Sequence, residues 1–94
     1  MIIAEIIEAG ALMFNLTLED IYGDNRSKYI CRARFAIYKG LLLRGASRPQ
    51  IAKWMKRDHS TVKHGIHRAD YMWERDPEFR QCVEKIVKLG KDND

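Results

Sequence analysis

The 94-residue sequence has few cysteines, no long apolar run and no lysine or arginine before position 26. No stretch approaches the roughly 20 apolar residues of a membrane-spanning helix. Glu5 and Glu8 interrupt the apolar start, which argues against a signal peptide. Cys31 and Cys82 form no Cys-x-x-Cys pair, so we interpret them as reduced core residues. These features predict one domain, residues 1–94, in the cytoplasm and without a membrane partner.

Metal-binding and catalytic patterns are also missing. His59, His64 and His67 offer no pair at i, i+4 spacing, and no cysteine pair or glutamate completes a metal site. Acid–base catalysis needs convergent carboxylates or a nucleophile beside a base, and Asp58 is the only acid between residues 26 and 68. The sequence contains no glycine-rich phosphate loop. We therefore expect no metal, no cofactor and no enzymatic activity.

Charge is strongly segregated along the chain. Residues 1–25 hold five acids and no Lys or Arg, a net charge of −5. Residues 26–68 hold twelve Lys or Arg and one acid, a net charge of +11, whereas residues 69–94 hold five bases and seven acids. A block this basic is typical of a surface that binds a polyanion, most often nucleic acid.

Apolar spacing and capping signals predict an all-α fold, a compact bundle of about five to six helices. Four aromatic side chains, at Trp54, Tyr71, Trp73 and Phe79, are expected in the core. Thr17 and Asp20 resemble a capping box, and Gly45 is the expected left-handed cap of the long helix. The expected helices span about 2–14, 17–23, 27–44, 47–55, 58–75 and 76–90, followed by a frayed tail at 91–94.

The segment from 47 to 75 has a helix-turn-helix pattern. Ser47 is a helix cap, Pro49 lies in the first turn, and Gln50 completes a capping box. Lys56 and Arg57 form a tight turn before a helix that begins near Asp58. A short helix, a tight turn and a second helix with a polar start are typical of DNA-binding helix-turn-helix modules.

Two clusters are candidate DNA contacts. Asp58, His59, Ser60 and Thr61 can bond base edges in the major groove, with Lys56, Arg57 and Lys63 contacting phosphates or bases. The alternatives are that Asp58 is only a helix cap and that His59 is an idle surface residue. The second cluster has Arg26 in a turn suited to the minor groove, with phosphate contacts from Lys28, Arg32 and Arg34; its alternative is a solvated helix start.

With these residues in view, the chain resembles the C-terminal DNA-binding domain, domain IV, of the bacterial replication initiator DnaA. The resemblance covers about residues 12–87, and Arg57–Val62 with His64 matches the family signature. It implies an all-helical fold with a helix-turn-helix, as in the Trp repressor, that recognises short duplex sites called DnaA boxes. It places major-groove reading at 58–61 and a minor-groove arginine at Arg26. The full candidate set is Arg26, Lys28, Arg32, Arg34, Ser47, Arg48, Pro49, Lys56, Arg57, Asp58, His59, Ser60, Thr61, Lys63 and His64.

Three departures from the family pattern favour a changed site preference. Ser60 replaces the usual Thr, Phe35 replaces a common Gln, and Lys56 stands where the family has a glycine pair. The initiator's ATPase domain is absent from these 94 residues, so we expect a stand-alone regulator of replication or transcription. Two alternatives are a non-specific architectural DNA-binding protein and a protein-interaction or homodimer module that uses the apolar N-terminal helix.

Overall fold

The computed structural model describes residues 3–91, which form six α-helices and no strand. None of these helices is both long and apolar enough to cross a bilayer. The all-α prediction is confirmed. In chain order the helices are α1 (Ile3–Met13), α2 (Leu18–Tyr22), α3 (Lys28–Leu43), α4 (Arg48–Met55), α5 (His59–Arg75) and α6 (Pro77–Lys91).

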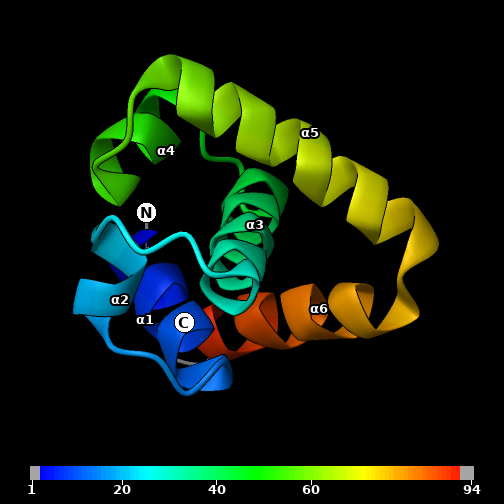
Figure 1. Cartoon of the computed structure of the whole chain (residues 1–94). Helices are drawn as coiled ribbons and strands as arrows, with labels where there is room; N and C mark the ends of the chain where they lie inside the picture. Colours follow the sequence, from blue (N-terminus) through cyan, green and yellow to red (C-terminus); the bar gives the residue numbers. More distant parts are fainter. Residues whose placement is uncertain (1–2, 92–94) are drawn as a thin grey trace.

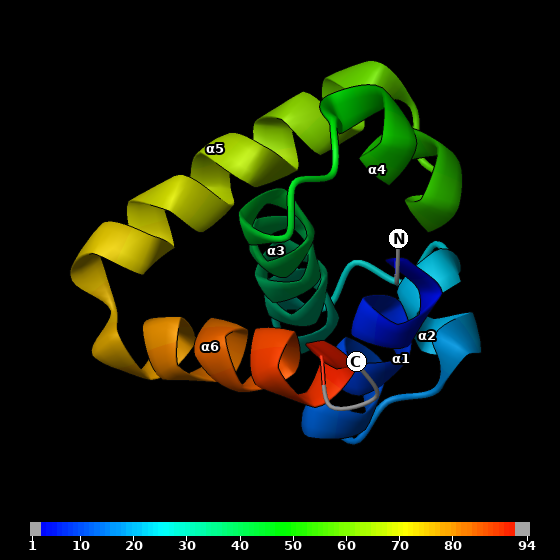
Figure 2. The ribbon, with the colours of Figure 1, turned by 180° about the vertical axis from the view of Figure 1, so that it is seen from behind.

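Helix α3 is the centre of the bundle. Figures 1 and 2 show α5 crossing one end of α3, α6 crossing the other end, and α1 and α2 beside it. Ala33, Ala36, Ile37 and Leu41 of α3 are fully buried. The apolar face of α1 is also buried, through Ile3, Ile6 and Ile7. The isoleucines that suggested a docking surface therefore belong to the core.

Two glycines allow helices to approach α3 closely. A Cβ at Gly10 of α1 would lie 2.2 Å from Cγ1 of Ile37, and a Cβ at Gly65 of α5 would lie 2.3 Å from Cε2 of Tyr38. Any side chain at either position would force these elements apart, because packed interiors leave no spare volume. The contact at Gly65 places α5 directly on Tyr38.

The helix starts have the caps that the sequence predicts. Thr17 and Asp20 form a reciprocal capping box, with hydrogen bonds of 3.1 and 2.9 Å. Ser47 and Gln50 form a second one, with bonds of 3.2 and 2.8 Å. Gly45 adopts the left-handed conformation, with φ of +92°. These local hydrogen bonds fix where α2 and α4 begin, and Gly45 fixes the turn that follows α3.

Several core assignments are wrong. Trp54 and Tyr71 are 44% and 56% exposed, although Trp73 is partly buried and Phe79 is fully buried as expected. Tyr71 lies instead under the Arg75 guanidinium, 4.0 Å from the ring centroid, at the surface. Trp54 faces away from the core on the short helix α4, whose buried face is formed by Ile51, Ala52 and Met55.

The two cysteines are free and half-buried, and the assignment of Cys31 as a core residue is corrected. Cys82 packs against the edge of the core, while Cys31 faces a surface groove. Both lie on helix positions that border the buried stripe, which explains why periodicity alone assigned them to the core.

The last helix continues through Gly90 to Lys91 rather than ending at Gly90. Gly90 is buried, and a Cβ there would lie 2.7 Å from Cγ1 of Ile6, so this glycine is required for packing against α1. Leu89, in the same helix, is 44% exposed. The expectations for Ile2 and for the tail at 92–94 lie outside the described residues.

Candidate nucleic-acid interface

A turn of only three residues, Lys56–Asp58, joins α4 to α5. Lys56 takes the left-handed conformation (φ 57°, ψ 45°), and its N–H donates to the carbonyls of Ala52 and Lys53. This conformation normally favours glycine. Because Lys56 adopts it, this one residue can make the bend for which the family that the sequence resembles has a glycine pair. The Lys56 ammonium lies 4.6 Å from the centroid of the Tyr22 ring.

Asp58 is the N-cap of α5. Its Oδ1 accepts hydrogen bonds from the Thr61 N–H at 2.7 Å and from the Ser60 hydroxyl at 2.9 Å. The Thr61 backbone hydrogen bond is the largest cause that lowers the pKa of Asp58 below its ordinary value. The carboxylate is therefore ionised at neutral pH, and it is fully exposed. Asp58 both caps the helix and presents a negative acceptor at its tip.

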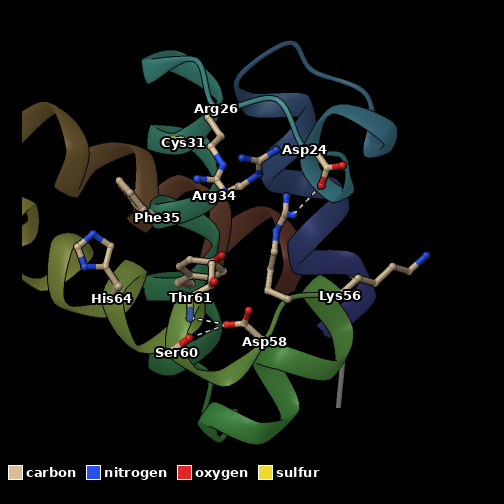
Figure 3. A pocket seen from close by; sticks show the side chains of 12 residues that line it. Asp24, Arg26, Cys31, Arg34, Phe35, Lys56, Asp58, Ser60, Thr61 and His64 are labelled. Atoms are coloured by element: carbon tan, nitrogen blue, oxygen red, sulfur yellow. Dashed lines mark hydrogen bonds and ion pairs between the residues drawn. The ribbon is translucent and has the colours of Figure 1, made fainter.

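The first turns of α5 have one buried face and one exposed face. Val62, Gly65 and Ile66 are buried against the bundle. The polar residues point outward, and Figure 3 shows the labelled members Asp58, Ser60, Thr61 and His64 facing one open space. The exposed residues of this helix start are Asp58, His59, Ser60, Thr61, Lys63 and His64.

That open space is a groove of about 620 Å³ between α5, α3 and the loop that joins α2 to α3. Arg26, exposed on this loop, forms the wall opposite Thr61 and His64 (Figure 3). The groove is lined by Asp24, Arg26, Cys31, Arg34, Phe35, Tyr38, Lys56, Arg57, Asp58, Ser60, Thr61 and His64.

Arg34 and Arg57 belong to the predicted set of DNA contacts. In the structure their guanidinium groups form hydrogen bonds within the protein. Arg34 is 6% exposed and donates to four backbone carbonyls at the end of α2 and in the loop that follows it. Arg57 donates to two of the same carbonyls. We refer to these two residues as the arginine bracket. Its acceptors are the carbonyl oxygens of Asp20, Ile21, Gly23 and Asn25.

Arg32 is also engaged away from the groove. Its Nη2 lies 2.9 Å from Oδ2 of Asp76, the N-cap of α6, and its guanidinium stacks over the Phe79 ring at 5.4 Å. This ion pair ties α3 to the α5–α6 junction and gives Arg32 a structural role in the free protein. Of the second basic cluster, Arg26 and Lys28 remain exposed.

The start of α4 adds a further exposed edge. Ser47, Arg48 and Pro49 are all exposed, and the Ser47 hydroxyl accepts from the Gln50 N–H. Together with the exposed helix start of α5 and the loop, these residues form what we call the contact face. Its members are Arg26, Lys28, Ser47, Arg48, Pro49, Lys56, Asp58, His59, Ser60, Thr61, Lys63 and His64.

Four groove residues were missing from the predicted set: Asp24, Cys31, Phe35 and Tyr38. The rings of Phe35 and Tyr38 lie 6.4 Å apart, and burial raises the pKa of the Tyr38 hydroxyl. Residues 35 and 38 lie one turn on from Cys31 and Arg34, so helical spacing could have identified this side of α3. Within residues 3–91, no three potential metal ligands come together.

A tight turn between two helices, with a polar and capped second helix exposed beside basic residues, defines a helix-turn-helix DNA-binding module. The comparison with protein families supports this class. Residues 3–69 match the family described as "Bacterial dnaA protein helix-turn-helix", and the chain belongs to that family.

Relatives of this family are chromosomal replication initiator proteins DnaA. The chain is 36% identical to the protein of Lachnoclostridium phytofermentans over 85 residues, which are 88% of this chain and 19% of that protein. It is 36% identical to the Neisseria meningitidis protein over 86 residues, 89% of this chain and 17% of the relative. For Gluconobacter oxydans the identity is 31% over 78 residues, covering 81% and 16%. The chain therefore spans less than a fifth of these relatives.

Proposed function

We propose that the chain binds double-stranded DNA with sequence preference, placing the start of α5 in the major groove and Arg26 in the adjacent minor groove. The observation that carries this proposal is that Arg26 and the start of α5 lie on opposite walls of one groove in the protein. Arg26 forms one wall, and Ser60, Thr61 and His64 form the other. A recognition helix reads bases with its N-terminal residues, and arginine favours a narrow, electronegative minor groove.

Each residue at the helix start has chemistry suited to a base edge. The Asp58 carboxylate can accept from cytosine N4, and the Thr61 methyl can contact the thymine methyl. His59 is exposed and can donate or accept. The Ser60 hydroxyl donates to Asp58, so Ser60 also holds the carboxylate in place. Asp58 is thus oriented by two hydrogen bonds before DNA arrives.

The remaining residues of the contact face are suited to the phosphate backbone. Lys28, Arg48 and Lys63 are exposed cations on three different helices, α3, α4 and α5. Contacts from several elements fix the orientation of a protein on the duplex without reading sequence. Ser47 and Lys56 lie beside them and complete the basic edge.

We infer that the biological role is regulation of replication or transcription by occupying DNA sites. The relatives are named as chromosomal replication initiators, and this chain corresponds to less than a fifth of their length. Its 94 residues contain no glycine-rich phosphate loop. DNA binding by this chain should therefore be independent of ATP and involve no catalysis.

Selection from a random duplex library tests the proposal. The selected duplex should bind at least about a thousandfold more tightly than a scrambled duplex of the same composition. Affinity should be unchanged by ATP. Equal affinity for selected and scrambled duplexes would instead identify a non-specific architectural protein.

A further inference from the structure

The arginine bracket binds the loop that carries Arg26. Arg34 Nε donates to the Ile21 carbonyl at 3.0 Å, Nη1 to that of Asn25 at 2.7 Å, and Nη2 to those of Asp20 and Gly23 at 3.0 and 2.9 Å. Arg57 Nη2 donates to Ile21 at 3.0 Å and also to Gly23. The two arginines are far apart in sequence but share two acceptors.

The acceptors explain why two like charges can lie together. Asp20, Ile21 and Gly23 are at the C-terminal end of α2, where carbonyls lack helical partners and the helix dipole is negative. Burial, followed by the charge of Arg57, lowers the pKa of Arg34, although an arginine remains protonated. Asp24 is 4.0 Å from Arg57 and fully exposed. The backbone carbonyls are therefore the main compensation for both charges.

The bracket connects the loop that carries Arg26 with the start of α5, the two elements on opposite sides of the protein groove. The carbonyl of Asn25, bound by Arg34, immediately precedes Arg26. On the other side of Arg26, the Ser27 N–H donates to Oδ1 of Asn25 at 2.9 Å. Arg57 immediately precedes Asp58, the cap of α5. One set of hydrogen bonds thus links the backbone around Arg26 to Arg57, the residue that precedes the N-cap of α5.

We propose that Arg34 and Arg57 are positioning residues that set the separation between Arg26 and the start of α5, and thereby couple minor-groove and major-groove reading. This inference rests on the proposed DNA binding. A planar guanidinium can reach several carbonyls at once, whereas a lysine ammonium at the same place has one nitrogen. The bracket therefore requires arginine rather than positive charge.

The rival assignment is that Arg34 contacts a phosphate. The two roles predict different results for Arg34→Lys, which keeps the charge. A positioning role predicts a non-additive double-mutant cycle with Arg26→Ala. Arg26→Ala should weaken binding to the selected duplex about tenfold in the native protein but less than twofold in the Arg34→Lys background. Additive losses would overturn the proposal.

Salt titration gives a second criterion. Arg34→Lys should leave the slope of log affinity against log salt unchanged, since no phosphate contact is lost. A slope that is less steep by about 1, with an equal loss of affinity for selected and scrambled duplexes, would identify a phosphate contact and overturn the proposal. Lys28→Ala is the matched control, because an exposed phosphate contact should reduce the slope by about 1. Arg57→Lys should reproduce the Arg34→Lys result.

Amide hydrogen exchange tests the bracket without DNA. In Arg34→Lys, exchange at Gly23 and Ser27 should rise at least about tenfold, while exchange in the middle of α5 stays unchanged. Circular dichroism confirms that the variant is folded. If loop exchange is unchanged, the positioning role is wrong. If native protein does not discriminate between duplexes but loop exchange rises, the proposed function fails while the bracket stands as a structural device.

Discussion

The contact face and the arginine bracket contain the same kinds of residue but use them differently. Arg26 and Lys28 are exposed, whereas Arg34, six residues beyond Lys28, is almost completely buried. Arg34 donates to two carbonyls of α2 and to two carbonyls of the following loop, and Arg26 lies on that loop. The +11 block is therefore not one binding surface. Part of its charge supports the backbone that presents the rest.

This division separates two measurable properties. Apart from the helix caps Ser47 and Asp58, residues of the contact face are solvated in the free protein, so replacing them should change binding and leave stability nearly unaltered. Residues of the bracket satisfy backbone acceptors, so replacing them should change stability and loop order. Each prediction below tests one side of the comparison against the other.

The largest expected effect is the salt dependence of DNA binding by the contact face. With roughly 5–8 phosphate contacts, log affinity should fall with a slope of about −5 to −7 against log salt, because bound cations release counterions. Fluorescence anisotropy between about 50 and 200 mM salt measures it. Arg75, exposed at the far end of α5, provides the control, since Arg75→Ala should leave the slope unchanged. A flat salt response would contradict DNA binding by this face.

Arg34→Ala should produce the largest loss of stability, about 2–4 kcal/mol in the free energy of unfolding. The substitution leaves loop carbonyls without donors and removes a buried side chain. Urea denaturation followed by circular dichroism measures the change. Arg26→Ala is the matched control and should alter stability by less than about 0.5 kcal/mol. Equal effects from the two variants would remove the distinction between bracket and contact face.

Within the contact face, His59→Ala should reduce discrimination between selected and scrambled duplexes by about 1–3 kcal/mol. His59 is exposed at the first turn of α5, which is the part of the helix proposed to enter the major groove. His67 is exposed on the same helix two turns later, so His67→Ala should leave discrimination unchanged. If both variants lose affinity equally for all duplexes, His59 does not read a base.

The sequence predicted local features well because their partners lie within three residues. The capping boxes at Thr17 and Ser47 and the cap at Asp58 all have the expected bonds. The sequence did not predict the internal hydrogen bonds of Arg34 and Arg57, because their acceptors lie 9–14 and 34–36 residues away. One signal for Arg34 was present, since it follows Ala33 and lies one turn from Ile30 and Ile37 on the buried stripe.

Exposed aromatic residues were misassigned for a related reason. Trp54 and Tyr71 have core-like composition, but their helix positions face outward. Periodicity defines one buried face for each helix, and α4 buries only Ile51, Ala52 and Met55. Which neighbouring positions are covered depends on tertiary packing, which a single sequence does not specify.

The smallest expected effect concerns the pH dependence of stability at Asp58, where capping and DNA contact meet. The Thr61 N–H lowers the folded-state pKa of Asp58 below the ordinary value of 3.8. The stabilisation is therefore fully present above the unfolded-state pKa and is lost as pH falls through the lower folded-state pKa. Asn still caps a helix but does not titrate here, so the stability difference between native protein and Asp58→Asn should shrink as pH falls from 5 to about 2. Thermal unfolding across this range measures it, with Arg26→Ala as a control that should track the native curve. Parallel curves for Asp58→Asn would show that the charge of Asp58 adds nothing to its cap, so that the carboxylate would serve DNA reading alone.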